Sequence, residues 1–458
     1  MKNIFKGGLL ILLLAFGGCR EILEPPPVDL LVDDLVLKGP DDIEPVRIGL
    51  YNALRSFGSC TIFAADFTPD YIQNNGTFTD FTELGTKSIT PANTLAATLW
   101  GNIYTTVYIA NFIEENIQAV ARVSQAEKDR LLAEAKFCRA YAYFIAVYTF
   151  GDVPNVTTTD VQVNRVIPRA SKREILEKVL ADYLDALAGL PDRWDADNAT
   201  LNKQFATKNA VRAGLARYYL YDENWEEAEK YAELVIASRL QSLDSSYVTV
   251  ISTEFDSESI FELAYANSSS DDPGTSTIGL NNILVGRREV IPSNSYVQEI
   301  LNINAGTRRA TIVFNGNNQQ GRDNGWTVTK YGTPDEGNNN ITVFRLAEMY
   351  LIRAEARAQQ NRIVGSMGAL EDINTLRRRA KAPLATFTTQ AAALNIIEVE
   401  RLYELSFEGH RWFDLKRTGR ISVVMNAFST RWNEKYNLWP IPLVEMQTNR
   451  LLTQNDNY

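Results

Sequence analysis

The chain contains a single histidine, His410, and only three cysteines, Cys19, Cys60 and Cys138. One histidine excludes motifs that place two histidines on one metal, and the cysteines are too few for a four-cysteine zinc site. The sequence also lacks the glycine patterns GxGxxG and GxxxxGK[ST], which cradle phosphates, and the GxSxG turn of serine hydrolases. Cys60 and Cys138 could form a disulfide or remain buried thiols, and the sequence leaves both open.

The chain also lacks an excess of basic residues, because 46 Lys and Arg stand against 56 Asp and Glu and give a net charge of −10. No run combines basic and aromatic residues, so we do not expect nucleic-acid binding. Asp195-Ala-Asp197-Asn198 has partial calcium-loop spacing but lacks the glycine and glutamate that complete such a loop. No local pair of acids stands out as a glycosidase pair. The sequence therefore singles out no catalytic group and no metal or cofactor motif.

Long hydrophobic runs are absent except near the start, where residues 9–16 are apolar and follow two lysines. This run is shorter than the about 20 residues that cross a membrane and has the features of a secretory signal. It ends in two glycines and Cys19, which resembles a bacterial lipobox with an acylated cysteine as the mature N-terminus. We predict a signal peptide over residues 1–18 and a lipid anchor with its tether over residues 19–40. The alternative is an ordinary cleaved signal in which Cys19 is incidental.

Apolar residues recur at helical spacing in eight segments that fall into four pairs. The pairs are 41–57 with 95–120, 124–150 with 171–190, 205–221 with 225–238, and 343–360 with 366–380. Ser124 with Glu127 forms a capping box, and the small residues Ala228 and Ala232 allow close helix packing. These features predict a mainly α fold of four tetratricopeptide-like helix pairs, in which stacked neighbours complete one core.

Two stretches lack helical periodicity. Residues 64–94 read as a loop rich in Asn, Thr and aromatic residues, and residues 241–342 hold four β-prone pieces, SYVTVIS, SIFELAYA, TIVFN and WTVTKYG, between dense turns. The chain after Gly419 is predicted to be extended and docked on the body. The chain therefore divides into a single domain over 41–458, with a scaffold of 41–240 and 343–419, an insertion of 241–342 and a tail of 420–458.

Residues 400–419, ERLYELSFEGHRWFDLKRTG, place His410 among charged and aromatic residues. Their spacing predicts one helix with an apolar face. It also predicts three ion pairs at i,i+3, namely Arg401–Glu404, Glu408–Arg411 and Asp414–Arg417. Such a segment favours a structural role for His410 over a catalytic one, and we interpret it as the terminal helix that closes the stack.

Aromatic and amide side chains gather in residues 66–81 and in the insertion. Sugars are bound by aromatic faces together with polar side chains that reach the hydroxyls, within a concave site. The candidate ligand-binding residues are Asp70, Tyr71, Asn74, Asn75, Phe78, Phe81, Tyr265, Arg322, Trp326 and Tyr331. We predict that the two segments jointly line a pocket, although each aromatic ring could instead anchor a loop on the scaffold.

Five motifs spread over most of the chain carry a resemblance to a known family. They are AEAKFCRAYAYFIAVYTFGDVP at 133–154, RLAEMYLIRAEA at 345–356, RLYELSFEGHRWFDLKRTG at 401–419, YNLWPIP at 436–442 and LTQNDNY at 452–458. They resemble the SusD/RagB family of outer-membrane lipoproteins. The resemblance implies four helix pairs with a loop-rich half, non-enzymatic capture of an oligomeric nutrient at the cell surface, and a SusC-type TonB-dependent transporter as partner. It also implies ligand sites in the two segments named above.

The function that we predict is capture of oligosaccharides for delivery to the transporter. An oligopeptide-binding member of the same family is an alternative, since no residue speaks against a peptide ligand. A glycoside hydrolase and an adaptor that binds only proteins are further alternatives.

Overall fold

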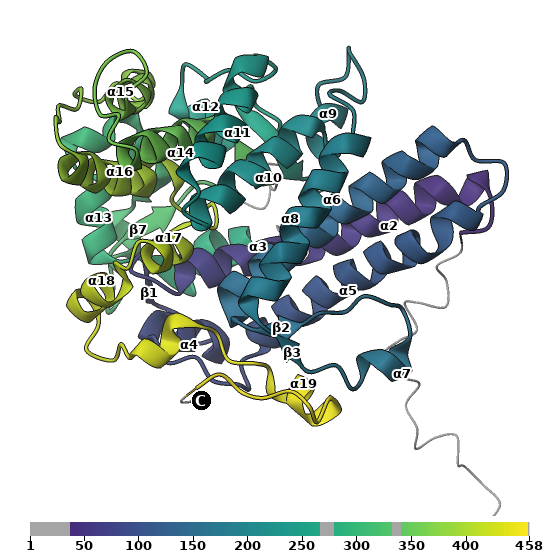
Figure 1. Ribbon diagram of the computed structural model, residues 1–458. Coiled ribbons are helices and arrows are strands. Elements are labelled where there is room, and N and C mark those ends of the chain that lie inside the picture. Colours follow the sequence, from purple (N-terminus) through teal and green to yellow (C-terminus); the bar gives the residue numbers. More distant parts are fainter. Residues whose placement is uncertain (1–36, 266–278, 332–339, 457) are drawn as a thin grey trace, which may run out of the picture.

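The computed structural model describes residues 37–265, 279–331, 340–456 and 458. The predicted signal peptide over 1–18 and Cys19 lie outside the described residues. Helices dominate the described part of the chain, accompanied by short two-stranded antiparallel sheets (Figure 1). No helix within these ranges combines the length and the apolar character needed to cross a membrane.

The four predicted helix pairs are confirmed. They are α2 (Ile43–Ser56) with α5 (Thr94–Asn116), α6 (Gln125–Phe150) with α8 (Lys172–Gly189), α10 (Lys208–Tyr221) with α11 (Trp225–Ser238), and α14 (Leu346–Gln359) with α15 (Ala369–Arg379). Successive pairs also touch, through α5 and α6, α8 and α10, and α11 and α14. In Figure 1 the stack therefore runs from α2 and α5 on the right to α14 and α15 on the left. Each pair covers an apolar face of its neighbour, as repeat packing requires.

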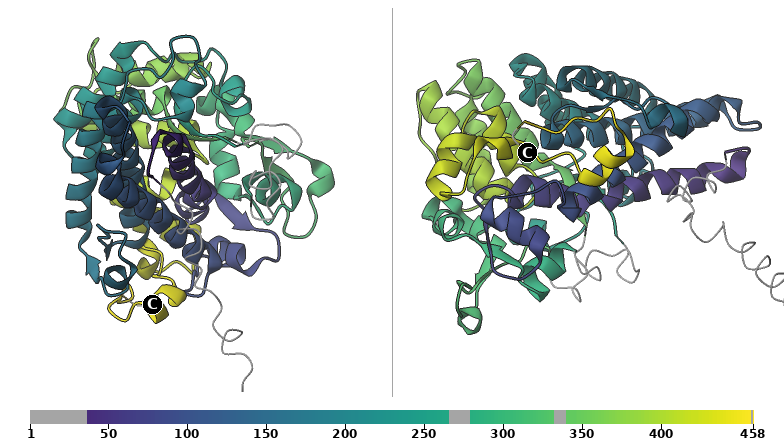
Figure 2. Two further views of the ribbon diagram at one scale, coloured as in Figure 1. Left: turned by 90° about the vertical axis from the view of Figure 1, so that its right-hand side faces the viewer. Right: turned by 90° about the horizontal axis from the view of Figure 1, so that it is seen from below.

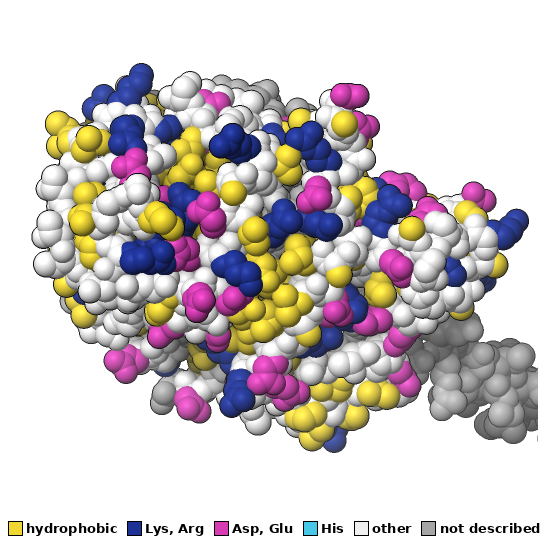
Figure 3. Space-filling view, turned by 45° about the horizontal axis from the view of Figure 1, so that its top comes forward, with side chains coloured by type: hydrophobic (Ala, Val, Ile, Leu, Met, Phe, Trp, Pro, Cys, Tyr) yellow, Lys and Arg dark blue, Asp and Glu magenta, His cyan; other side chains and the backbone are white. Residues whose placement is uncertain are grey.

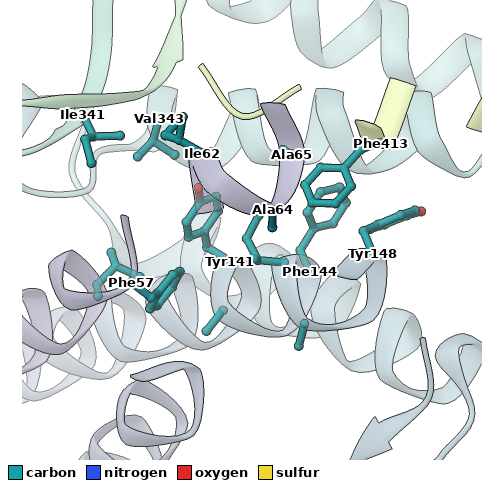
Figure 4. Close-up of a cluster of buried hydrophobic side chains, with 14 of the residues drawn as sticks. Phe57, Ile62, Ala64, Ala65, Tyr141, Phe144, Tyr148, Ile341, Val343 and Phe413 are labelled. Atoms are coloured by element: carbon teal, nitrogen blue, oxygen red, sulfur yellow. The ribbon is translucent and has the colours of Figure 1, made fainter. Parts of the chain in front are cut away.

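The core is centred on α6 and on the chain that follows α2. The ring of Phe57 stacks on that of Tyr141 with centroids 6.0 Å apart. Figure 4 shows Ile62, Ala64 and Ala65 beside Tyr141 and Phe144 of α6, with Phe413 from the C-terminal part close by. Segments far apart in the sequence thus share one apolar interior, which contributes about 25 cal/mol for each Å² of apolar surface removed from water.

Both remaining cysteines lie in this interior as free, buried thiols, so the disulfide alternative does not hold. Burial raises the pKa of the Cys60 thiol to about 12. Since the thiolate is the reactive form, Cys60 is chemically inert at neutral pH.

Residues 64–94 hold more regular structure than the loop that we predicted. They include most of the π-helix η3 (Phe63–Phe67), the strand β1 (Ile72–Asn74) and the helix α4 (Thr79–Thr86). Helix α4 buries only Phe81 and Leu84. Two apolar residues on so short a helix leave no periodicity to detect, which is why the sequence concealed it.

Three of the four predicted β pieces in the insertion are confirmed as β4 (Ser259–Leu263), β6 (Ile312–Phe314) and β7 (Trp326–Val328). The prediction for SYVTVIS was wrong, because it forms the helix α12 (Tyr247–Ser252). Tyr247, Val250 and Ile251 are its buried residues, at the helical spacing i, i+3 and i+4. The insertion also contains β5 (Val290–Pro292), α13 (Asn294–Ile300) and the 3₁₀ segment η6 (Ile303–Thr311), and β4 pairs with β8 (Ile341–Arg345), which leads into α14.

The tail after residue 419 is only partly extended. It forms the helices α18 (Ile421–Phe428) and α19 (Leu443–Thr448), and the chain around Trp439 docks on the body as predicted. The backbone N–H of Trp439 donates to the carbonyl of Thr149 over 2.8 Å, and its indole Nε1 donates to Thr68 Oγ1 over 3.0 Å. One buried ring therefore fixes the tail to two distant elements.

The segment 400–419 is not the single helix that we predicted. It is divided between α16 (Gln390–Leu405) and α17 (Arg411–Arg417), and Phe407 and Gly409 between them have positive φ angles of 63° and 86°. The buried carboxylate of Asp66 accepts the backbone N–H groups of Gly409, His410 and Arg411 at 2.5, 3.2 and 3.0 Å. This carboxylate satisfies the donors that are exposed where α17 begins.

Of the three predicted i,i+3 ion pairs, only Asp414–Arg417 is confirmed, at 2.8 Å. The other two predictions were wrong, because these side chains find partners on other elements. Arg401 pairs with Asp414, Glu404 with Arg345 and Arg379, Glu408 with Lys330 and Arg345, and Arg411 with Asp70. Most charges of this segment therefore pair with Asp70, with the insertion and with other elements of the scaffold instead of with one another along one helix.

The surface carries both signs of charge. The face in Figure 3, with the top of Figure 1 turned forward, shows Lys and Arg side chains interspersed with Asp and Glu, and a group of hydrophobic side chains near its middle. On this face the mixture leaves no broad basic field of the kind that attracts nucleic acid.

Candidate ligand-binding surface

The structure brings the two predicted segments together. Strand β1 pairs antiparallel with β5 of the insertion, with Gln73 opposite Ile291, and β7 packs beside β5. Both views of Figure 2 show the chain around β1 and α4 beside the insertion. We call the strands β1, β5, β6 and β7, together with the loop after β1 and the loop between β6 and β7, the strand platform.

A buried carboxylate shapes the loop that follows β1. Glu289 accepts the backbone N–H groups of Thr77 and Phe78 at 2.7 and 2.9 Å, and its own carbonyl accepts those of Asn75 and Gly76, both at 2.9 Å. A Cβ atom on Gly76 would lie 1.9 Å from Glu289 Oε2. The close approach therefore requires glycine at this position, and it sets the direction in which Phe78 leaves the loop.

An ion pair fixes the β6–β7 hairpin to the rest of the strand platform. The Arg288 guanidinium donates to both carboxylate oxygens of Asp323, over 2.9 and 2.6 Å, and Asn75 Nδ2 donates to the same carboxylate over 3.2 Å. Burial alone would raise the pKa of Asp323, but the hydrogen bonds from Arg288 and from the Gly325 N–H hold it below its ordinary value. Asp323 thus stays charged, and Asn75 serves to join the two segments.

Aromatic rings remain open on the hairpin. Phe314 of β6 is 48% exposed and lies opposite Trp326 of β7, with ring centroids 5.2 Å apart. Trp326 is half-buried, and the exposed Arg322 lies in the connecting turn, where its carbonyl accepts from Gln73 Nε2 over 3.4 Å. Phe314 was not among the predicted residues. Its strand pairing with Trp326 was the signal that could have found it, because opposite residues project on the same face.

A second open ring lies on the loop after β1. Phe78 is half-buried, and the exposed guanidinium of Arg287 lies over its ring, 4.0 Å from the centroid. The stack keeps one face of Phe78 occupied and orients Arg287, which the sequence did not single out.

Three predicted ligand residues are buried instead. The ring of Tyr71 packs on those of Tyr296 and Phe407, with centroids 4.9 and 5.4 Å away, and Phe81 packs on the ring of Phe63 at 5.0 Å. The hydroxyl of Tyr331 donates to the carbonyl of Phe407. All three are loop anchors, which was the alternative for every predicted ring, because a large apolar ring is stabilised more by burial than by exposure on a loop.

Asp70, Asn74 and Tyr265 are also engaged by the protein. Asp70 receives two hydrogen bonds from Arg411, at 3.0 and 2.9 Å, and although burial would raise the pKa of Asp70, this guanidinium lowers it overall. Asn74 Oδ1 accepts from Thr82 Oγ1 over 3.2 Å, and the Tyr265 hydroxyl donates to a carbonyl near the end of α2 over 2.8 Å. The sequence-predicted residues that stay open on the platform are therefore Phe78, Arg322 and Trp326.

His410 is buried at the start of α17. Burial, followed by the charges of Arg217 and Arg401, lowers the pKa of His410 well below its ordinary value, so its imidazole is neutral. Within the described ranges, no group of three His, Cys, Asp or Glu side chains is placed to hold a metal ion. At the calcium-like stretch, Asp195 Oδ1 instead accepts the backbone N–H of Asp197 over 2.7 Å in a local turn.

The fold is thus a helical-repeat scaffold that presents half-exposed rings on a small strand platform. Residues 293–458 match the family model described as SusD family, and residues 49–220 match the one described as starch-binding associating with outer membrane. The chain belongs to the SusD/RagB family, as its motifs predicted.

Proteins of known description align with this chain. SusD-like protein P25 of Formosa agariphila is 25% identical over an alignment of 516 positions that covers 97% of each chain. The starch-binding protein SusD of Bacteroides thetaiotaomicron is 33% identical over 150 residues, which cover 31% of this chain and 25% of that protein.

Solved structures share the fold at lower identity. A laminarin-binding SusD-like protein aligns with a TM-score of 0.78 at 22% identity, and covers 92% of this chain and all of its own. Surface glycan-binding protein A of Bacteroides fluxus aligns with a TM-score of 0.77 at 22% identity over the same share of each chain. The predicted SusD-like architecture is therefore confirmed.

Proposed function

We propose that this protein captures oligosaccharides on its strand platform. The main observation that supports this proposal is the pair of rings of Phe314 and Trp326, which project together from the hairpin beside the exposed Arg322. Adjacent open rings provide the apolar faces on which sugar rings stack, and the guanidinium and nearby amides supply hydrogen bonds to hydroxyls. The platform is rigid beneath these rings, because Arg288, Asp323 and Glu289 fix its loops.

The comparisons support a saccharide ligand. One matched family is described as starch-binding, and one protein of the same fold is described as laminarin-binding. Capture without catalysis is part of the proposal, since relatives are described as binding proteins. Release of reducing ends from laminarin or starch by the purified protein would contradict this part.

Calorimetric titration with laminarin and starch oligosaccharides tests the ligand class. We expect Trp326→Ala and Phe314→Ala each to lower the affinity for the oligosaccharide that binds by about tenfold or more, as for a central aromatic anchor. Val313→Ala is the matched control, because Val313 is 50% exposed on the same strand but alternates to the other face.

Two results would contradict the proposal. One is that a broad panel of saccharides does not bind the unmodified protein while oligopeptides do. The other is that both ring variants bind the oligosaccharide as tightly as Val313→Ala does.

The proposal also includes anchoring by an acylated Cys19 at the outer membrane, with surface exposure, and transfer of the ligand to a SusC-type TonB-dependent transporter. Its support is the lipobox-like sequence and the family description of outer-membrane association. A Cys19→Ser variant should move from the membrane fraction to the soluble fraction, and the unmodified protein should co-purify with a TonB-dependent transporter. Retention of Cys19→Ser in the membrane fraction would contradict the proposed lipid anchor.

A further inference from the structure

A cleft of about 450 Å³ lies among α10, α11, α14, α16 and α17, on residues that the strand platform does not use. Its volume is within the range of about 300–1,000 Å³ that is typical of small-molecule sites. Leu220, Leu394, Ile397 and Leu402 give it apolar walls, and the half-buried Trp225 adds an aromatic ring. The cleft therefore has the size and the apolar surface to enclose one ring of a small ligand.

Three of the four carboxylates that line the cleft are already paired, and the fourth, Glu223, is exposed. Asp414 accepts from Arg401 over 2.7 Å and from Arg417 over 2.8 Å. Glu355 accepts two further hydrogen bonds from Arg417, and Glu398 accepts from Arg420 over 3.0 Å. These acids hold their own cations, so they leave little acceptor capacity for a ligand's donors.

Arg401 is the exception among the arginines of the cleft. It lines the cleft, is only 4% exposed, and uses Nε for Asp414. Its two terminal nitrogens are buried and have no hydrogen-bond partner among the described residues. A buried donor without an acceptor is destabilising, and more so when it is charged. The unmet capacity at this cleft is thus that of these two coplanar donors and of the buried Nδ1 of His410, which also lines the cleft and has no hydrogen-bond partner among the described residues.

We propose that this cleft binds a small molecule, about the size of one sugar ring, through a carboxylate that reaches the terminal nitrogens of Arg401. Guanidinium and carboxylate groups match as planar forks with two parallel hydrogen bonds, which no hydroxyl or ammonium group reproduces. The ring of the ligand lies against the leucine side chains and Trp225. This site is independent of the strand platform, so it stands whether or not oligosaccharides bind there.

The test is titration of the mature protein with D-glucuronate, D-galacturonate and N-acetylneuraminate, with D-glucose and D-galactose as the neutral counterparts of the first two. We expect at least one acid to bind, and its neutral counterpart, or D-glucose in the case of N-acetylneuraminate, to bind at least about tenfold more weakly. Leu394→Trp, which narrows the cleft without touching an ion pair, should abolish binding. Leu384→Trp is its control, since Leu384 is an exposed leucine outside the cleft.

Arg401→Lys retains the charge but removes the planar pair of donors. It should lower the affinity for the acid about tenfold or more in protein that still unfolds cooperatively. Trp326→Ala on the strand platform should leave this binding unchanged, which separates the two sites. The proposal is overturned if no acid binds, if the neutral sugar binds equally well, or if Leu394→Trp binds like Leu384→Trp.

Discussion

Single residues of the same type have different roles here, and tryptophan shows it best. Trp412 is 1% exposed and meets the ring of Trp432 edge to face, with centroids 5.5 Å apart. Trp412→Ala should therefore lower the free energy of unfolding by about 3–5 kcal/mol, the usual cost of emptying such a site. Urea unfolding followed by circular dichroism measures it. The half-buried Trp326 is the control, and a loss of similar size in Trp326→Ala would contradict the contrast.

The sequence could identify open site residues only in part. Phe78, Arg322 and Trp326 were placed correctly on the accessible platform, because turn-rich segments lie at the surface. Tyr71 and Tyr331 were not, since both are held by Phe407, a residue more than 70 positions away. No local pattern distinguishes an aromatic anchor from an open ring when its partner comes from another element.

Among the elements, the long helices were predictable and the break in 400–419 was not. Helices such as α6 and α8 carry their own caps, since Ser124 and Ser171 accept the backbone N–H groups of Glu127 and Glu174 at 3.3 and 3.2 Å. The break depends instead on Asp66, whose carboxylate binds three N–H groups from the other end of the chain. Tertiary hydrogen bonds thus override helical spacing, which is a local signal.

The break can be tested through glycine. Gly409 has a φ of 86°, and a Cβ atom there would find its nearest neighbours at an ordinary 3.6 Å. Gly409→Ala therefore suffers from backbone strain alone, and we expect it to lower the free energy of unfolding by about 1–2 kcal/mol. Urea unfolding of purified protein checks the value.

Gly101 supplies the opposite control on a regular helix. It lies inside α5, and its Cβ atom would meet nothing within 4 Å. Gly101→Ala should raise the free energy of unfolding by up to about 1 kcal/mol, because alanine loses less conformational entropy in a helix. The interpretation of the break is wrong if both substitutions shift stability in the same direction.

At the scale of the whole molecule, buried ion pairs join the insertion to the scaffold. Arg345 at the end of β8 contacts Glu258, Glu404 and Glu408, and Lys330 of the insertion also contacts Glu408. Removing one partner leaves an uncompensated buried charge, which costs more than the pair contributes. The platform and the helix stack are therefore expected to unfold as one cooperative unit.

The pH dependence of this unit follows from Glu262, a buried acid on β4. Burial raises the pKa of Glu262 to about 7, more than its hydrogen bonds from Ser259, Asn340 and the Phe255 N–H lower it. Between about pH 4.5 and pH 7 the folded state therefore holds a proton that the unfolded state has lost. By linkage, this group's contribution to stability falls as the pH rises through that window, by up to about 3 kcal/mol.

Glu262→Gln removes that titration while keeping the shape of the side chain. The difference between its free energy of unfolding and that of the unmodified protein should therefore rise in favour of the variant by about 1–3 kcal/mol from pH 5 to pH 8. Urea unfolding at a series of pH values measures this difference. Glu404→Gln is the control. Although burial opposes it, the charges of Arg379 and Arg345 lower the pKa of Glu404 well below its ordinary value, so its titration lies outside this range. The cost of Glu404→Gln should stay constant from pH 5 to pH 8, and a constant difference for Glu262→Gln as well would show that Glu262 is already charged at pH 5.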